Sequence, residues 1–178
     1  MIINWLRFTW DLEKIPTAEP SVPAPFTLRV TEGDEEAAVQ KTVASAFSMD
    51  TGWGDIQKFL IERMTKSIGL AFEKDSKSRC LVLLHGTRII GASVLCTDPD
   101  ADNHLTTGPC ILHEYGSRGL GSLLLSASLS ALRADGLKRA YGITREKTAS
   151  ARFIYPKSGG GAAAPWTLDL EAPAKPAA

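Results

Sequence analysis

The hydrophobic positions along this chain switch between two spacings, and the switches divide it into short elements. Apolar runs of five to eight residues, alternating or continuous, predict strands. They lie at residues 26–30, 80–84, 89–95, 105–112, 138–144 and 166–170. Because these strands alternate with helical segments, the pattern indicates a mixed α/β (α+β) domain.

Between the strands, apolar residues three and four apart predict helices. Asp34 is expected to cap the first of them, which carries Val39, Val43 and Phe47 on one face. The other predicted helices cover 56–66, 120 to a C-terminal Gly136, and 148–157. Pro109 falls inside the fourth strand and cannot donate a backbone hydrogen bond, so that strand is expected to be broken or bulged.

Composition shifts divide the chain into four parts. Residues 1–15 form an apolar, aromatic N-terminal extension, and 16–25 form a linker with four prolines. Residues 26–170 form the main domain, and 171–178 are expected to be a disordered tail. The aromatic extension is expected to be buried, either on the domain or on a partner, which includes a homodimer as one possibility.

Charge and cysteine usage exclude several classes of function. The 20 basic and 20 acidic residues balance, which argues against a nucleic-acid partner. No apolar run reaches the roughly 18–20 residues that span a bilayer, and the N-terminus lacks the features of a signal peptide, so a cytoplasmic protein without a membrane partner is expected. Three well-separated cysteines form no metal-ligand cluster, so no metal is expected.

Three glycines lie between the fourth predicted strand and the helix that follows it. Gly116, Gly119 and Gly121 have the order G-x-x-G-x-G, followed by Ser122 and a run of leucines. A strand, a bare backbone loop and a helix N-terminus together suit a phosphate or pyrophosphate. The order differs from the dinucleotide fingerprint, and no lysine follows as in a P-loop, which disfavours a nucleotide-binding domain.

Two motifs carry a resemblance to a known family. The run ILHEYGSRGLG at residues 111–121 resembles the acyl-CoA loop of the GCN5-related N-acetyltransferases (GNAT), with a glycine at 116 where a glutamine or arginine is usual. Downstream, residues 148–159 resemble the pattern N-x-x-A-x-x-x-Y-x-K-x-G, with Thr148 in place of the asparagine and Ala151, Tyr155 and Lys157 in register. The resemblance covers residues 26–170.

The resemblance implies a GNAT-like fold, in which the fourth and fifth strands of a mixed central sheet splay apart and helices flank the sheet. It also implies acetyl-CoA as the co-substrate, with pantetheine in the gap and pyrophosphate on the glycine loop, and no metal. The residues it places at the cofactor are Cys110, Ile111, Leu112, Gly116, Ser117, Arg118, Gly119, Leu120, Gly121, Ser122 and Thr148.

Two residues are candidates for proton transfer. The resemblance implies that Tyr155 is the general acid for the departing thiolate, and His104 is a candidate general base because its side chain titrates near neutral pH. Glu114 is a weaker candidate, and Cys110 an unfavoured acyl acceptor. The acceptor amine is expected at the junction of the first two helices, beside Asp50, Trp53 and Asp55.

The sequence therefore predicts an N-acetyltransferase that acts on a primary amine of a small molecule or peptide. The reaction is expected to proceed by direct attack in a ternary complex. The alternative is a catalytically degenerate sensor or scaffold that binds acyl-CoA without turnover, which Gly116 and Thr148 favour.

Overall fold

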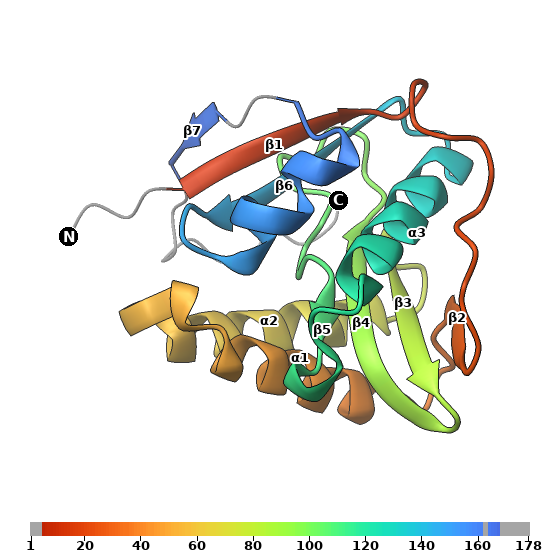
Figure 1. The fold of residues 1–178 in the computed structure, drawn as a ribbon, viewed down its shortest axis with the longest axis vertical. Helices are drawn as coiled ribbons and strands as arrows, with labels where there is room; N and C mark the ends of the chain where they lie inside the picture. Colours follow the sequence, from red (N-terminus) through yellow and green to blue (C-terminus); the bar gives the residue numbers. More distant parts are fainter. Residues whose placement is uncertain (1–4, 162–163, 168–178) are drawn as a thin grey trace.

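The chain folds into two sheets with helices on both sides (Figure 1). The computed structural model describes residues 5–161 and 164–167. The first sheet has the order β2-β3-β4-β5, made of Phe26–Val30, Ser78–His85, Arg88–Cys96 and Cys110–Ile111. The second has the order β6-β1-β7, made of Arg139–Arg145, Trp5–Asp11 and Ala164–Trp166. Every pairing is antiparallel, and the strands predicted from the sequence appear in the expected order.

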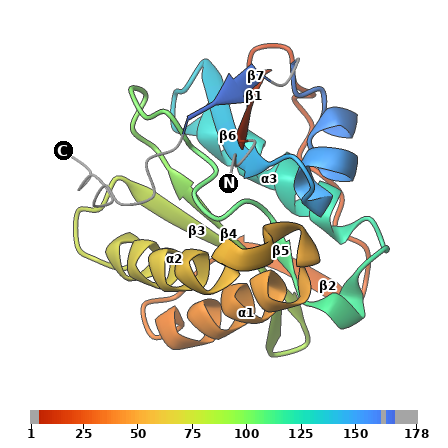
Figure 2. The same ribbon diagram turned by 90° about the vertical axis from the view of Figure 1, so that its left-hand side faces the viewer.

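Three long helices, α1, α2 and α3, complete the layers, and their places around the first sheet can be followed in Figures 1 and 2. The helices α1 (Glu36–Met49) and α2 (Gln57–Ala71) lie side by side on one face of the first sheet. The helix α3 (Leu120–Ala134) covers the opposite face and ends before Gly136, which has the left-handed φ of 92° expected there. The predicted helix at 148–157 is instead a π-helical turn, η3 (Ser150–Ile154), followed by a 3₁₀ turn, η4 (Pro156–Ser158).

The N-terminal segment contributes the middle strand of the second sheet. β1 pairs with β6 along its whole length and with β7 on its other side. Trp5, Phe8 and Trp10 are all buried within the chain, Phe8 and Trp10 against Tyr155 and Trp5 against Trp53. Of the two outcomes that the sequence left open for this segment, packing on the domain is the one observed. The predicted tail at 171–178 and the last residues of the strand expected at 166–170 lie outside the described residues.

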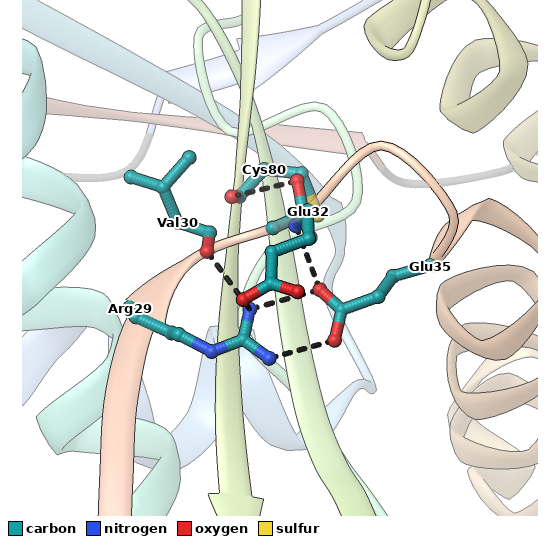
Figure 3. Close-up of polar contacts among 6 residues, drawn as sticks. Arg29, Val30, Glu32, Glu35 and Cys80 are labelled. Carbon is teal, nitrogen blue, oxygen red and sulfur yellow. Dashed lines mark hydrogen bonds and ion pairs between the residues drawn. The ribbon is translucent and has the colours of Figure 1, made fainter.

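The connection from β2 to α1 differs from the expected cap (Figure 3). The helix begins after Glu35, so Asp34 is not the N-cap residue, and no side chain caps this end. The Glu35 carboxylate instead accepts hydrogen bonds from Arg29 Nη1 and Nη2, at 2.9 and 2.7 Å, and from the Glu32 backbone N–H at 2.8 Å. The Arg29 guanidinium holds the pKa of Glu35 below its usual range. This two-point contact fixes α1 to the first sheet.

The predicted fourth strand is broken, as expected from Pro109. Only Cys110 and Ile111 form a ladder with β4, together with an isolated bridge from Leu105 to Leu95. Between them, Gly108 turns the chain with a φ of 66°. The first sheet therefore ends at a very short strand, and no ladder joins β5 to β6.

Candidate active site

The two sheets are fastened to each other at one end of the gap between β5 and β6. The backbone N–H groups of His104 and Leu105 both donate to the Tyr141 carbonyl of β6, at 2.8 and 3.2 Å. The Tyr141 N–H donates to His104 Nδ1 at 2.9 Å, and the Ile143 N–H donates to Asn103 Oδ1 at 3.2 Å. These contacts close this end, which we call the closed end of the cleft.

At the other end, β5 leaves backbone groups unused. The Leu112 N–H, just after β5, donates to the Ile90 carbonyl at 2.9 Å, so the backbone groups of Leu112 and Cys110 face β4. Because alternate residues of an antiparallel strand point to opposite edges, the N–H and C=O of Ile111 face away from β4, toward the gap. We call this the open end. Pantetheine-like amides suit such an edge, and the Ile111 N–H suits a carbonyl oxygen that gains negative charge.

The glycine loop leads from the open end to the N-terminus of α3. Ser117 and Gly119 have left-handed φ values of 58° and 75°, and no side chain caps the helix. A Cβ built at Gly119 would meet nothing within 4 Å, so the backbone at the helix start is uncovered. The unused N–H groups of the first turn and the positive end of the helix dipole therefore fit a pyrophosphate.

Other predicted cofactor residues differ in their exposure. Arg118 is exposed but folds back, with its guanidinium 5.4 Å from the centre of the Tyr115 ring and Nη2 donating to the Glu114 carbonyl at 3.3 Å. Leu120 is buried, whereas Gly121 and Ser122 are half-buried. Thr148 is fully buried, and its hydroxyl accepts from the Ala151 N–H of η3 at 3.3 Å, so the hydroxyl is engaged within the chain.

Tyr155 lies behind the cleft, where the broken fourth strand passes close to its hydroxyl. A Cβ at Gly108 would come within 2.8 Å of Tyr155 Oη, so only glycine permits this approach. The ring packs edge-on against Phe8 and Trp10 and is 1% exposed. Burial raises the pKa of Tyr155, which keeps the phenol protonated, and the neighbouring Cys110 adds to the rise.

Cys110 is adjacent to this tyrosine but is a poor nucleophile. Its thiol donates to the Thr107 carbonyl at 3.6 Å, and burial raises its pKa to about 12. A thiol of that pKa is almost entirely protonated near neutral pH, and the thiolate is the reactive form. Cys110 thus packs beneath the cleft, in agreement with the interpretation that it is not an acyl acceptor.

His104 does not have the solvated position expected of a residue in a polar turn. It is fully buried, and Nδ1 must accept because the Tyr141 N–H donates to it. Nε2 then donates to the Asp98 carbonyl at 3.0 Å. Burial lowers its pKa from 6.5, partly offset by Asp98 and Asp102. With both ring nitrogens occupied, His104 has no free lone pair to take a proton from an amine, which argues against the predicted role of general base.

Glu114 is placed away from the cleft as well. Its carboxylate accepts from Arg88 Nη2 at 2.7 Å, and hydrogen bonding from its own backbone N–H, supported by Arg88, lowers its pKa. It is therefore an exposed ion-pair partner on the outer side of the glycine loop.

The three predicted acceptor residues lie on or beside η1 (Thr51–Ile56), and their environments differ. Trp53 is buried and stacks on Phe47, with ring centroids 4.9 Å apart, so it is part of the core. Asp55 forms an ion pair with Arg145 at 3.6 Å, and Arg145 also donates to the Trp53 carbonyl. Asp50 is half-buried, accepts from the Gly52 N–H at 2.9 Å, and is close enough to Cys110 for its charge to raise that thiol's pKa. Asp50 is the acid of this group that lies near the cleft.

Sequence reasoning missed Arg145, Gly52 and Gly108. Arg145 ends β6 and ties η1 to it, while Gly52 allows η1 to approach the Lys147–Thr148 backbone. No local pattern distinguishes Arg145 or Gly52, because their role comes from contacts between segments more than 90 residues apart in sequence. Only the Gly108-Pro109 pair gave a local signal, as a break in the strand.

The described residues hold no group of three or more side chains suited to a metal ion. Within the same part of the chain, no helix is both long and apolar enough to cross a membrane.

Comparison with solved structures shows the same fold at low sequence identity. A GCN5-related N-acetyltransferase from Kribbella flavida is 14% identical, with a TM-score of 0.56 over 92% of this chain and 55% of the other. One from Sphaerobacter thermophilus is 16% identical, with a TM-score of 0.58 over 90% and 49%. A tandem GNAT protein of the clavulanic acid biosynthesis pathway is 16% identical, with a TM-score of 0.57 over 93% and 51%. The chain thus spans about half the length of these structures.

The sequence comparisons give the family but no close relative. No protein of curated function matches the chain significantly. The model of the acetyltransferase (GNAT) family matches residues 44–159, which include η1, the broken fourth strand, the glycine loop and Tyr155. Members of this family transfer acetyl groups from acetyl-CoA. With its fold, its splayed strands and more than half its length in agreement, this chain belongs to the GNAT acetyltransferase family.

Proposed function

We propose that this protein N-acetylates a primary amine of a small molecule or peptide, by direct attack of the amine on acetyl-CoA in a ternary complex. The observation that carries the proposal is the open end of the cleft. There β5 has an edge that no ladder joins to β6, the N-terminus of α3 is uncapped, and burial keeps the Tyr155 hydroxyl protonated. Acetyl-CoA supplies an activated thioester, and the residues around the cleft bind and orient it.

The binding roles follow from the backbone. The N–H groups from Ser117 to Ser122 are proposed to hold the pyrophosphate, with Arg118 swinging from Tyr115 to add a positive charge. The Ile111 N–H is proposed to stabilise the thioester oxygen as it gains charge during attack. Gly116 offers only its backbone here, so its contribution to cofactor affinity is smaller than that of the long side chain usual in the family.

Tyr155 is proposed to donate a proton to the departing thiolate. A general acid must be protonated when it acts, and burial keeps this phenol so across the physiological range. Gly108 leaves the space that this hydroxyl occupies, because a Cβ at residue 108 would lie 2.8 Å from Tyr155 Oη.

The acceptor must reach the cleft as a neutral amine. For an amine with a pKa of about 10.4, deprotonation at pH 7 costs roughly 4–5 kcal/mol. His104 is unsuited to remove that proton because both its ring nitrogens are occupied. Asp50 is proposed to bind and orient the amine, which releases its proton to solvent.

The test is a pair of measurements on the whole chain. Titration calorimetry with acetyl-CoA is expected to show binding, and free thiol is expected to be released when a panel of amines is added. Binding without thiol release would favour the second candidate, an acyl-CoA sensor or scaffold, for which Gly116 and the burial of Thr148 are the supporting observations. Absence of binding would overturn both.

A further inference from the structure

A hollow of about 600 Å³ adjoins η1, the element that carries or borders the proposed acceptor residues, and the proposed chemistry does not yet use it. It is open to solvent and is lined by residues of two segments, Thr51 and Gly52 of η1 and Glu146, Lys147 and Arg152 of the β6–η3 connection. Its lining contains two cations and one carboxylate, so it is net positive.

The hollow has two walls, one formed by Thr51 and Gly52 and the other by Glu146, Lys147 and Arg152, and each wall is close in sequence to a residue of the proposed site. Gly52 packs against the other wall so closely that a Cβ there would lie 2.7 Å from the Lys147 carbonyl oxygen. On the wall formed by Thr51 and Gly52, the Gly52 N–H donates to Asp50 Oδ1 at 2.9 Å, and the charge of Asp50 contributes to the raised pKa of Cys110. On the second, Arg152 precedes Tyr155 by one helical turn. Because Thr51 and Gly52 follow Asp50 directly in the chain, a molecule in the hollow lies beside the segment that carries Asp50.

The two cations are available to a ligand. Lys147 and Arg152 are both exposed, and within the described residues neither forms an ion pair with a carboxylate. Arg152 lies over the ring of Phe153, 5.2 Å from its centre, which holds the guanidinium at the rim. By contrast, Arg145 is paired with Asp55 and points its charge toward η1. The positive charge of the hollow thus belongs to Lys147 and Arg152.

We propose that the acceptor is a small amine that also carries a carboxylate, of the amino-acid type. Its carboxylate binds Lys147 and Arg152 in the hollow, while Asp50 orients its amine toward the open end. An arginine can bind a carboxylate through two parallel hydrogen bonds, and a nearby lysine adds charge. The inference rests on the proposed acetyl transfer and narrows its substrate class.

Matched acceptors test the proposal. Phenylalanine and 2-phenylethylamine differ by one carboxylate, as do β-alanine and ethylamine. With acetyl-CoA saturating, KM for the carboxylate member of each pair is expected to be at least tenfold lower. Arg152→Glu and Lys147→Glu should each raise that KM about tenfold and leave the KM of the decarboxylated amine unchanged or lower. Lys66→Glu, an exposed lysine of α2 outside the hollow, is the control and should change neither.

A binding measurement separates failure of this inference from failure of acetyl transfer. Titration calorimetry of phenylalanine and 2-phenylethylamine into the protein with coenzyme A is expected to show tighter binding of the amino acid, and Arg152→Glu should abolish the difference. Equal or tighter binding of the decarboxylated amine, or binding of neither, overturns the anionic-acceptor proposal even where other amines are acetylated. Tighter amino-acid binding without thiol release supports the hollow's specificity and contradicts only the proposed turnover.

Discussion

The two ends of the cleft are built from one stretch of chain, residues 103–112, yet they use their backbone groups in opposite ways. At the closed end, Asn103 and His104 tie the stretch to β6 through several hydrogen bonds. At the open end, Ile111 turns its N–H and C=O away from β4, toward a gap that no strand of the described residues fills. Gly108 and Pro109 separate the two, because neither supports a regular ladder.

The difference shows how a fold keeps backbone groups unpaired without losing stability. An unused edge costs little where solvent or a ligand reaches it, but it must be held apart from its neighbour. The closed end provides that restraint, since its buried side chains set where β6 departs from the first sheet. Changes at the closed end should therefore alter stability, whereas changes at the open end should alter turnover.

The largest effect is expected from Tyr155→Phe at the open end. Loss of the proton donor should lower kcat about 10²- to 10⁴-fold, while the ring contacts with Phe8 and Trp10 remain. Thiol release under saturating acetyl-CoA and amine measures it. Tyr141→Phe is the matched control at the closed end, where the ring stacks on His104, and it should keep a rate near that of the wild type. Full turnover by the Tyr155 variant would remove the proposed acid.

His104→Ala should act on the closed end and on stability. The Tyr141 N–H and the Asp98 carbonyl would each lose a buried partner, at a total cost of about 2–4 kcal/mol in the free energy of unfolding. Urea denaturation measures the loss. The pH dependence of kcat/KM should keep its shape for whatever variant remains folded. If stability stays constant while the acid limb of that profile disappears, His104 is a base after all.

Gly52→Ala should disturb the wall shared by η1 and the hollow. Its Cβ would come within 2.7 Å of the Lys147 carbonyl oxygen and 2.8 Å of Thr148 Cα, so the backbone must move at a cost of about 1–3 kcal/mol. KM for the amine should rise more than KM for acetyl-CoA. Gly33→Ala is the control, because a Cβ there meets nothing within 4 Å and should stabilise the protein by about 0.4–1 kcal/mol. Equal effects of the two variants would contradict the close approach.

The smallest effect is a pH dependence of stability from the closed end. Burial lowers the pKa of His104, so the unfolded chain binds a proton at this residue more readily than the folded one. The contribution of neutral, buried His104 to the free energy of unfolding is complete above about pH 6.5, and it is lost as pH falls toward the lowered pKa of the folded state. Urea midpoints between pH 7.5 and 5 should decline in the wild type and less in His104→Gln. Parallel declines would show that other groups account for the loss.

Local sequence patterns were sufficient to predict the features that depend on interactions between residues close together in the chain. The order of strands and helices, the glycine loop and the break at Pro109 follow from hydrophobic spacing and backbone stereochemistry, and each is present. The cap at Asp34 was wrong because a tertiary partner, Arg29, engages the neighbouring Glu35 and the helix starts after it. Trp53 and Asp55 were predicted to bind the acceptor, but both are engaged by other residues. The Trp53 ring packs on Phe47 in the core, and the Asp55 carboxylate forms an ion pair with Arg145.

By itself, the sequence determined the family, the fold class and the position of the glycine loop, because motif register and hydrophobic periodicity are carried by residues close together in the chain. Only the tertiary structure decided that the N-terminal strand completes the second sheet, that His104 is enclosed at the closed end, and that Lys147 and Arg152 gather beside Thr51 and Gly52. Strand insertion, burial and charge clustering depend on segments distant in sequence meeting in space. The free energies of these features depend on contacts between distant segments, so no local sequence pattern predicts them.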